Sequence, residues 1–259
     1  MPIMQKIILV CPFFGLGIII VVASVVLSVV GLIIVKRYIS HQKLKTHNDI
    51  AGAIFQTLGV AYTVLLAFMV VVAWQNFDRT SLTAETEANY LVDLMEDSSA
   101  FSKDFSMKIR AASEEYAKNV INQEWPMLAE GKESPVAKES LGKISALYAS
   151  YMPQNVKEEI FLAESVKKLN LLGEMRRIRI FESRQGIPAL LWVVLIVGAF
   201  ATITFTFFFG SDNPKAQMLM TSLLAVVIAL ILYTVLSLDF PFTGGIKVNP
   251  DAFREMLKY

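Results

Sequence analysis

The sequence has few of the residues that build disulfide frameworks, metal centres and nucleic-acid surfaces. Its 259 residues include one cysteine, Cys11, and two histidines, and the formal net charge is only +1. A single cysteine excludes an internal disulfide, and a near-neutral chain gives no electrostatic reason to bind nucleic acid. His41 and His47 lie in a basic loop without acidic or thiol partners. We interpret them as solvated or headgroup-facing side chains rather than metal ligands.

Ionisable side chains are also missing from four long apolar stretches, which we predict to be transmembrane helices. These stretches are residues 7–35, 50–77, 187–210 and 216–238. Each is long enough to cross about 30 Å of hydrocarbon at about 1.5 Å per residue. The first is longer than the apolar region of a cleaved signal peptide and ends without a small-residue cleavage site, so we expect it to be retained.

The lack of charge inside these helices also bears on chemistry. Proton-coupled transporters carry ionisable groups within the membrane, and intramembrane hydrolases need a base or metal ligands there. We therefore predict no catalytic residue, no metal site and no cofactor, and we do not expect an enzyme.

What the chain does contain is a high apolar content, with 54% hydrophobic residues and a mean hydropathy of +0.51. The sequence predicts an all-α integral membrane protein with four transmembrane helices and a helical extramembrane region between helices two and three. The predicted divisions are 1–77 for helices one and two, 78–186 for the extramembrane region continuous with helix two, 187–238 for helices three and four, and 239–259 for the C-terminal tail.

The extramembrane region is predicted to be helical throughout. Beyond Asp78 the composition turns polar, with neither glycine nor proline to end the second helix. Apolar residues then recur every three or four positions, which predicts a long amphipathic helix over residues 83–124. Two further helices, 136–151 and 155–182, are predicted on either side of Pro153. The acidic residues Glu85, Glu87 and Asp93 are interpreted as a solvated helix face.

One face of the second predicted helix is small and polar at one end and apolar at the other. Steps of four and three residues align its members, which we call the 52–70 stripe: Gly52, Gln56, Gly59, Thr63, Leu66 and Val70. Two interpretations remain open, because small residues in a span either allow close packing with another helix or line a pore. In a pore, Gln56 and Thr63 would be wetted, and Leu66 and Val70 would form a dry constriction.

Four charged residues fall at one predicted membrane edge: Asp78, Arg79, Arg184 and Asp239. We interpret them as candidate pore-mouth charges whose sign would tune ion preference. A carboxylate at this depth is costly unless it is paired, so we also expect at least one of the two aspartates to form a salt bridge within this group. The distribution of lysine and arginine near the span ends favours a cytoplasmic location for the termini and residues 78–186.

Several segments carry a further signal: Asn48, Gly52, Gly59, residues 62–68, Trp74, Glu87-Ala88-Asn89, Pro188, Leu191-Trp192, residues 238–242 and Gly244-Gly245. Together they resemble a bacterial membrane family described as bestrophin-like. The resemblance covers nearly the whole chain past the first helix. It implies a relative of the oligomeric bestrophin anion channels, multi-pass in the bacterial inner (cytoplasmic) membrane, with both termini and a large portion between the second and third helices inside.

The resemblance transfers no individual pore or calcium residue. The aromatic neck and the acidic calcium clasp expected of bestrophins are not found at positions that align with this sequence. Glu96-Asp97 is a lone acidic pair, well short of the alternating ligands of a calcium-binding loop.

Two functional hypotheses follow. The first is an oligomeric ion channel, anion-conducting by resemblance, whose partners are the lipid bilayer, inorganic ions and further copies of the chain. We predict a homo-oligomer because four spans from one chain do not easily enclose a water-filled path. The second hypothesis is a non-conducting membrane-anchored interaction or signalling module whose working surface is the amphipathic 83–124 helix.

Overall fold

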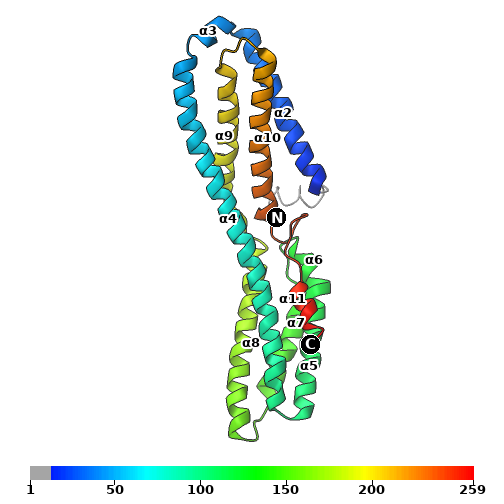
Figure 1. Ribbon diagram of the computed structural model, residues 1–259. Coiled ribbons are helices and arrows are strands. Elements are labelled where there is room, and N and C mark those ends of the chain that lie inside the picture. The colour runs from blue at the N-terminus through cyan, green and yellow to red at the C-terminus, as the bar shows by residue number, and fades with distance from the viewer. Residues whose placement is uncertain (1–12) are drawn as a thin grey trace. The chain divides into compact units, whose positions relative to one another are not determined.

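The computed structural model describes residues 13–259, without the side chains of Phe13, His41 and Lys43. The predictions for Cys11 and for the start of the first span fall outside these residues. The described chain forms two units (Figure 1). The membrane unit comprises residues 13–76 and 187–239, and the extramembrane unit comprises residues 77–186 and 240–259.

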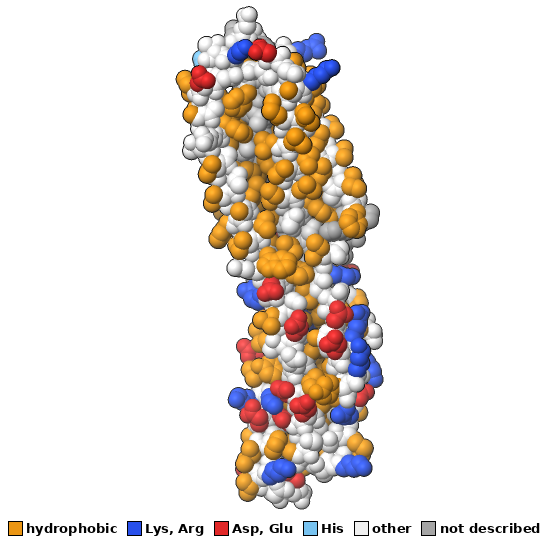
Figure 2. Space-filling view, in the orientation of Figure 1, with side chains coloured by type: hydrophobic (Ala, Val, Ile, Leu, Met, Phe, Trp, Pro, Cys, Tyr) orange, Lys and Arg blue, Asp and Glu red, His pale blue; other side chains and the backbone are white. Residues whose placement is uncertain are grey.

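The membrane unit contains the four predicted transmembrane helices. They are α2 (Phe13–Tyr38), the first half of α4 (Asn48–Asp97), α9 (Ala189–Phe205) and α10 (Pro214–Asp239), with the short α3 (His41–Lys45) and η3 (Thr206–Phe208) at one end. All four are long and apolar enough to span a bilayer. Figure 2 shows this unit covered by hydrophobic side chains, with charged residues gathered at its end. The four-span, all-α prediction is confirmed.

Local sequence explains where these helices begin. Pro214 opens α10, where its missing N–H removes no helical hydrogen bond, and Asn213 Oδ1 accepts from Ala216 N at 3.1 Å as a cap. Pro188 directly precedes α9. Within the unit, α2 and α10 pack most extensively against each other.

The extramembrane unit is built from helices alone within the described residues. Its elements are the second half of α4, η1 (Ser98–Ala100), α5 (Lys103–Asn119), η2 (Val120–Glu124), α6 (Trp125–Leu128), α7 (Pro135–Ser150), α8 (Val156–Glu182) and α11 (Asp251–Met256). The predicted helices at 136–151 and 155–182 match α7 and α8 within a residue at each end. At 50 residues α4 is about 75 Å long, more than twice the thickness of the hydrocarbon core.

The predicted single helix over residues 83–124 is wrong. α4 ends at Asp97, a 3₁₀ turn follows, and α5 begins at Lys103 with Ser102 as its N-cap, whose side chain accepts from Phe105 N at 3.4 Å. Ser98 Oγ donates to Met95 O at 2.6 Å, a local bond that competes with helix continuation. The chain therefore turns back here, and the apolar faces of α4 and α5 join one buried cluster with residues of α7 and α8.

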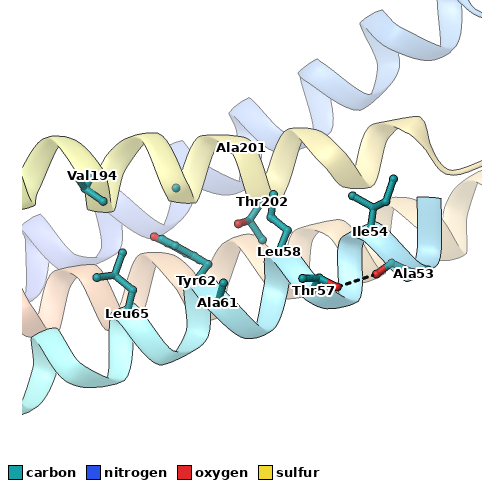
Figure 3. A pocket seen from close by; sticks show the side chains of 11 residues that line it. Ala53, Ile54, Thr57, Leu58, Ala61, Tyr62, Leu65, Val194, Ala201 and Thr202 are labelled. Carbon is teal, nitrogen blue, oxygen red and sulfur yellow. Dashed lines mark hydrogen bonds between the residues drawn. The ribbon is translucent and has the colours of Figure 1, made fainter. Parts of the chain in front are cut away.

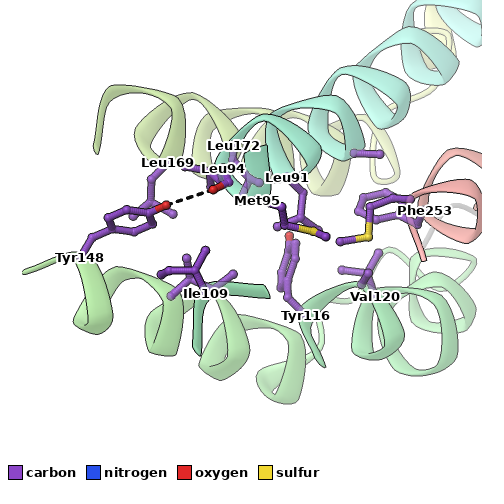
Figure 4. Close-up of a cluster of buried hydrophobic side chains, with 14 of the residues drawn as sticks. Leu91, Leu94, Met95, Ile109, Tyr116, Val120, Tyr148, Leu169, Leu172 and Phe253 are labelled. Carbon is purple, nitrogen blue, oxygen red and sulfur yellow. Dashed lines mark hydrogen bonds between the residues drawn. The ribbon is translucent and has the colours of Figure 1, made fainter. Parts of the chain in front are cut away.

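The core of the extramembrane unit lies between α4, α5, α7 and α8, with α11 against one end (Figure 4). Leu91, Ile109, Val120, Leu172 and Phe253 are fully buried. Burying a side chain of this size stabilises a fold by about 1.5–3 kcal/mol. This apolar packing holds the polar groups described below.

Candidate functional site

The 52–70 stripe lies on the membrane half of α4. Gln56 and Thr63 are exposed in the single chain, and a Cβ built on Gly52 or Gly59 would meet no described atom within 4 Å. Val70 is half-buried, whereas Leu66 is buried with 3% of its surface exposed. The small and polar end of the stripe is therefore uncovered by the described helices, and Leu66 packs inside the unit.

Three bulky apolar residues next to the stripe are also uncovered. Val60, Val64 and Phe68 are 60, 64 and 65% exposed, and their four-residue spacing places them on one side of α4. Burial of Tyr62, Leu66, Met69 and Ala73 marks the opposite side, which packs against the rest of the unit. The burial pattern therefore shows which side of α4 faces the rest of the unit, which the stripe in the sequence did not show.

The start of α4 is fixed to the loop between α9 and α10. Asn48 Nδ2 donates to Gly210 O at 2.8 Å, and its Oδ1 accepts from Gly210 N at 2.9 Å. Nearby, Lys45 Nζ pairs with Asp212 Oδ2 at 2.6 Å. The amide side chain of Asn48 thus joins two segments of the unit. This reciprocal pairing defines one polar end of the membrane unit.

Deeper in the membrane unit, Tyr62 joins α4 to α9. Its hydroxyl donates to Leu195 O at 2.8 Å, where both groups are buried. The tyrosine ring lies against Gly198, and a Cβ at that position would overlap the ring. Glycine is therefore required at 198 for this close approach.

A groove of about 770 Å³ lies between α4 and α9 (Figure 3). Its walls are apolar or small, and Tyr62, Leu65 and Val194 line one end while Ala53 and Ile54 line the other. The groove is a surface of the membrane unit, so hydrocarbon or protein must cover it.

The buried end of α10 carries Asp239, one of the four edge charges. Its Oδ1 accepts from Ile187 N at 2.5 Å, and its Oδ2 accepts from Trp192 Nε1 at 3.1 Å. Asp239 therefore ties the end of α10 to the start of α9. The two segments that the sequence resemblance singled out separately, around Trp192 and around Asp239, are partners in space.

The expectation of a salt bridge at an edge aspartate is wrong. Within residues 13–259, neither Asp78 nor Asp239 takes part in an ion pair. An amide and an indole N–H satisfy Asp239, and Asp78 is exposed, so water can solvate it. At Asp239, neutral N–H donors thus take the place of the basic partner that was expected.

The two edge arginines have partners of their own within the extramembrane unit. Arg79 Nε donates to Glu182 Oε1 at 3.0 Å, joining α4 to the end of α8. Arg184 Nε donates to Gly131 O at 2.8 Å, and Gly131 has the positive φ of 68° that favours glycine. The pore-mouth role of these charges stays a prediction.

The most concentrated polar chemistry lies inside the extramembrane unit. Arg179, fully buried, donates through Nε to Glu87 Oε2 at 2.7 Å and through Nη2 to Glu124 Oε1 at 2.8 Å. Arg176 also pairs with Glu124, and Tyr116 donates its hydroxyl to Glu87 Oε1 at 2.6 Å. We call these two arginines and two glutamates the buried charge cluster. Its charges balance, as burial of ions requires.

Aromatic rings and backbone groups complete this cluster. The Arg179 guanidinium carbon lies 5.1 Å from the Trp125 ring centre and 5.8 Å from that of Phe253, which are cation–π distances. Ser134 N donates to Glu124 Oε2 at 3.2 Å. The cluster and its contacts therefore connect α4, α5, η2, α6, α8 and α11 with Ser134, the N-cap of α7.

The same contacts decide the ionisation states. Burial alone would raise the pKa of Glu124, but Arg179 and Arg176 outweigh it and hold that pKa below its usual value. Burial and the adjacent Glu87 carboxylate raise the pKa of Tyr116 well above its usual value, so the phenol stays protonated. Outside the cluster, burial raises the pKa of Glu182 despite the attraction of Arg79.

Sequence reasoning misplaced Glu87 on a solvated face. Glu87 follows Ala84 by three residues and precedes Leu91 by four, so it shares the apolar side of α4. Arg176 and Arg179 continue the apolar series Leu169 and Leu172 in the same way. A charge on an apolar helix face was therefore the available signal. Glu124 gave the same signal, since it follows the buried Val120 by four residues and precedes the buried Leu128 by four, although it lies on the π-helical turn η2.

Metal-binding geometry is absent from the part of the chain that the structure describes. No group of three or more histidine, cysteine, aspartate or glutamate side chains comes together there. Asp97, from the acidic pair at 96–97, instead pairs with Lys168 Nζ at 2.9 Å. His47 is exposed, and the His41 side chain lies outside the described set.

Comparisons with known proteins agree on one family. A model of the Bestrophin-like domain matches residues 22–253. Two single-substitution variants of a bacterial bestrophin homologue from Klebsiella pneumoniae superpose with TM-scores of 0.68 and 0.67, at 13 and 12% identity, over 92% of this chain and 96 and 98% of theirs. A further structure of that homologue gives 0.63 at 14% identity, over 92% of this chain and 95% of its own.

No curated protein matches the sequence significantly. The structural likeness, at such low identity, shows a shared fold. Because the family model spans most of the chain, this membrane protein belongs to the bestrophin-like family.

Proposed function

We propose that the protein is the subunit of a homo-oligomeric ion channel in which α4 lies nearest the path. The observation that carries this proposal is the exposed Gln56, about 12 Å along a membrane helix from its start. An amide facing hydrocarbon is costly, so either water or another subunit must cover it. Exposed Thr63 and the open sides of Gly52 and Gly59 extend the same polar face.

A closed ring of copies satisfies this requirement. Every copy must keep one orientation in the bilayer, so the ring axis is normal to the membrane. Around such an axis the uncovered faces of α4 meet, and Gln56 and Thr63 line the wetted part. The inner bacterial membrane, with the termini and residues 78–186 in the cytoplasm, is the location that we propose. Reporter fusions at the C-terminus test that orientation.

The burial of Leu66 changes which residues we propose for the constriction. Leu66 is buried within its own unit and is therefore a poor lining residue. Val64 and Phe68, which are exposed and lie one turn apart, are better placed to form a dry ring that excludes water. We propose Val64 and Phe68 as the gate.

The permeant ion has two candidates. Family resemblance favours anions. The exposed face of α4 beyond the membrane favours cations, because Asp78, Glu85 and Glu96 share it, whereas the exposed Arg79 lies about 100° around the helix and pairs with Glu182. Reversal potentials in a salt gradient distinguish these two possibilities directly.

Planar bilayers containing the purified oligomer test the channel itself. We expect conductance, with Val64→Ser and Phe68→Ser raising the open probability because a polar ring removes the dewetting barrier. Leu223→Ser, at an exposed apolar position on α10, is the matched control and should leave gating unchanged. Silence from oligomeric protein across voltages, salts and calcium levels would reject the proposal. Recovery of a stoichiometric soluble partner would then favour the interaction module.

A further inference from the structure

A small pocket of about 160 Å³ lies between α4 and the C-terminal residues 240–259, wholly within the extramembrane unit. Phe77, Ser81 and Glu85 line it from one side, and their four-residue spacing places them on one face of α4. Lys247 and Asn249 line it from the C-terminal segment. We call it the tail pocket. An engineered protein cavity of about 150 Å³ holds one benzene molecule, so this volume suits a ligand of about six non-hydrogen atoms.

The C-terminal wall of the tail pocket is held in place by contacts outside it. Trp125 Nε1 donates to Val248 O at 3.1 Å, and Val248 N donates to Pro241 O at 2.7 Å. Phe253, which also lines the pocket, is fully buried, and its ring centre lies 5.9 Å from that of Trp125. The fold therefore preforms the pocket.

Opposite charges line the tail pocket without pairing with each other. Within residues 13–259, neither Glu85 nor Lys247 takes part in an ion pair, and Glu85 Oε1 accepts only a long hydrogen bond of 3.4 Å from Ser81 Oγ. The third lining charge, Asp251, is already paired with Arg254 Nη1 at 2.8 Å. The pocket therefore offers one carboxylate and one ammonium group that no described side chain neutralises.

A small zwitterion complements these two charges. Its ammonium group would pair with Glu85 and its carboxylate with Lys247, and the Asn249 amide can donate to or accept from either end. Phe77 and Ala84 add an apolar wall for a short aliphatic side chain. An ion with a single charge would satisfy only one of the two groups. Small neutral amino acids carry both charges and are close to the required size.

We propose that the tail pocket binds a small neutral amino acid between Glu85 of α4 and Lys247 of the C-terminal segment. Both side chains are exposed, so a dissolved ligand can reach them from water. Glu85 also belongs to the face of α4 that we turn toward the path, and a zwitterion adds no net charge there. Binding does not depend on whether the protein conducts ions.

Titration calorimetry on the full-length protein in detergent tests the site. We expect glycine, alanine or serine to bind saturably, with one site per chain. Acetate and methylammonium each carry one of the two charges and should bind about tenfold more weakly, because each leaves one charged partner unsatisfied. The proposal is overturned if none of the three amino acids gives a saturable signal, or if acetate or methylammonium binds as tightly as they do.

Neutral variants of the two charged residues provide the second arm. Glu85→Gln and Lys247→Gln should each weaken amino-acid binding about tenfold, because each removes one charge-assisted contact. Glu139→Gln and Lys138→Gln, at exposed positions of α7, are the matched controls and should bind like the wild type. Both pocket residues are exposed, so their variants should keep the wild-type unfolding temperature. Unchanged affinity in both pocket variants would also overturn the proposal.

Discussion

Arg179 is the residue on which the extramembrane unit depends most. It is a fully buried cation that contacts two carboxylates and two aromatic rings from separate elements. Its planar guanidinium reaches Glu87 and Glu124 at once, which the single ammonium of lysine does not reproduce. The cluster therefore ties these elements in one specific arrangement.

Replacing Arg179 by methionine should destabilise the protein severely. The substitution leaves Glu87 and Glu124 buried with less compensation, and breaking such a pair costs about 3–5 kcal/mol. Thermal unfolding of the detergent-purified protein, followed by circular dichroism, measures the loss. Arg177→Met on the same helix is the control, because Arg177 is exposed. Equal unfolding temperatures for the two variants would contradict the role given to the cluster.

Pairs of helices are held together by contacts of single side chains. Tyr62 and Gly198 set the approach of α4 to α9, and Arg79 with Glu182 joins α4 to α8. In each case a single side chain from one helix meets a shaped or charged position on the other. Substituting one of these few residues is therefore enough to disturb how two helices pack.

Gly198→Ala should weaken the membrane unit by about 1–3 kcal/mol, because the added methyl overlaps the Tyr62 ring and forces it to move. The expected result is a lower thermal inactivation temperature. Gly142→Ala, a helical site with no described neighbour within 4 Å of the new Cβ, should stabilise the protein slightly or leave it unchanged. If Gly198→Ala behaves like Gly142→Ala, the glycine is not needed for this contact.

The pH dependence of stability should report on Glu182. Its pKa is raised by burial, so the folded state binds more protons than the unfolded state between the usual glutamate pKa and the raised value. The stability contributed by this group is therefore full below about pH 4.5 and is lost as pH rises through the raised pKa. Glu124, with its lowered pKa, contributes in the opposite direction.

Glu182→Gln isolates this effect. The variant cannot ionise, so its stability relative to wild type should increase as pH rises from about 4.5 toward neutrality. Unfolding temperatures at a series of pH values give the difference curve. Glu139→Gln, an exposed glutamate on α7, should give a flat difference. A curve for Glu182→Gln that falls with pH would show that the Arg79 attraction, not burial, dominates.

For the assembled protein, charge near the end of the membrane half of α4 should influence ion preference. Asp78→Asn removes an exposed negative charge from the proposed path. We expect the reversal potential in a salt gradient to move in the direction of greater relative anion permeability, most strongly at low ionic strength, where screening is weakest. Glu139→Gln again serves as the control. An unchanged potential would place Asp78 away from the path.

Much of this architecture could be read from sequence because its causes are local. Apolar stretches without charge can only be satisfied as helices in a bilayer, so four spans and their approximate limits followed from composition and length. The segments 136–151 and 155–182 were predicted as helices on either side of Pro153. The end of α4 at Asp97 was missed because serines, which end helices weakly, replaced the expected glycine or proline.

Tertiary structure decided what the polar residues do. Asp239 was visible as a costly charge, but only the fold could bring Ile187 N and the Trp192 indole to it. Glu87, Glu124 and Arg179 come from positions up to 92 residues apart, and no local pattern states that they meet. Leu66 and Val64 look alike in sequence, yet packing buries one and exposes the other. Helix formation depends on neighbours along the chain, whereas ion pairing and burial depend on neighbours in space.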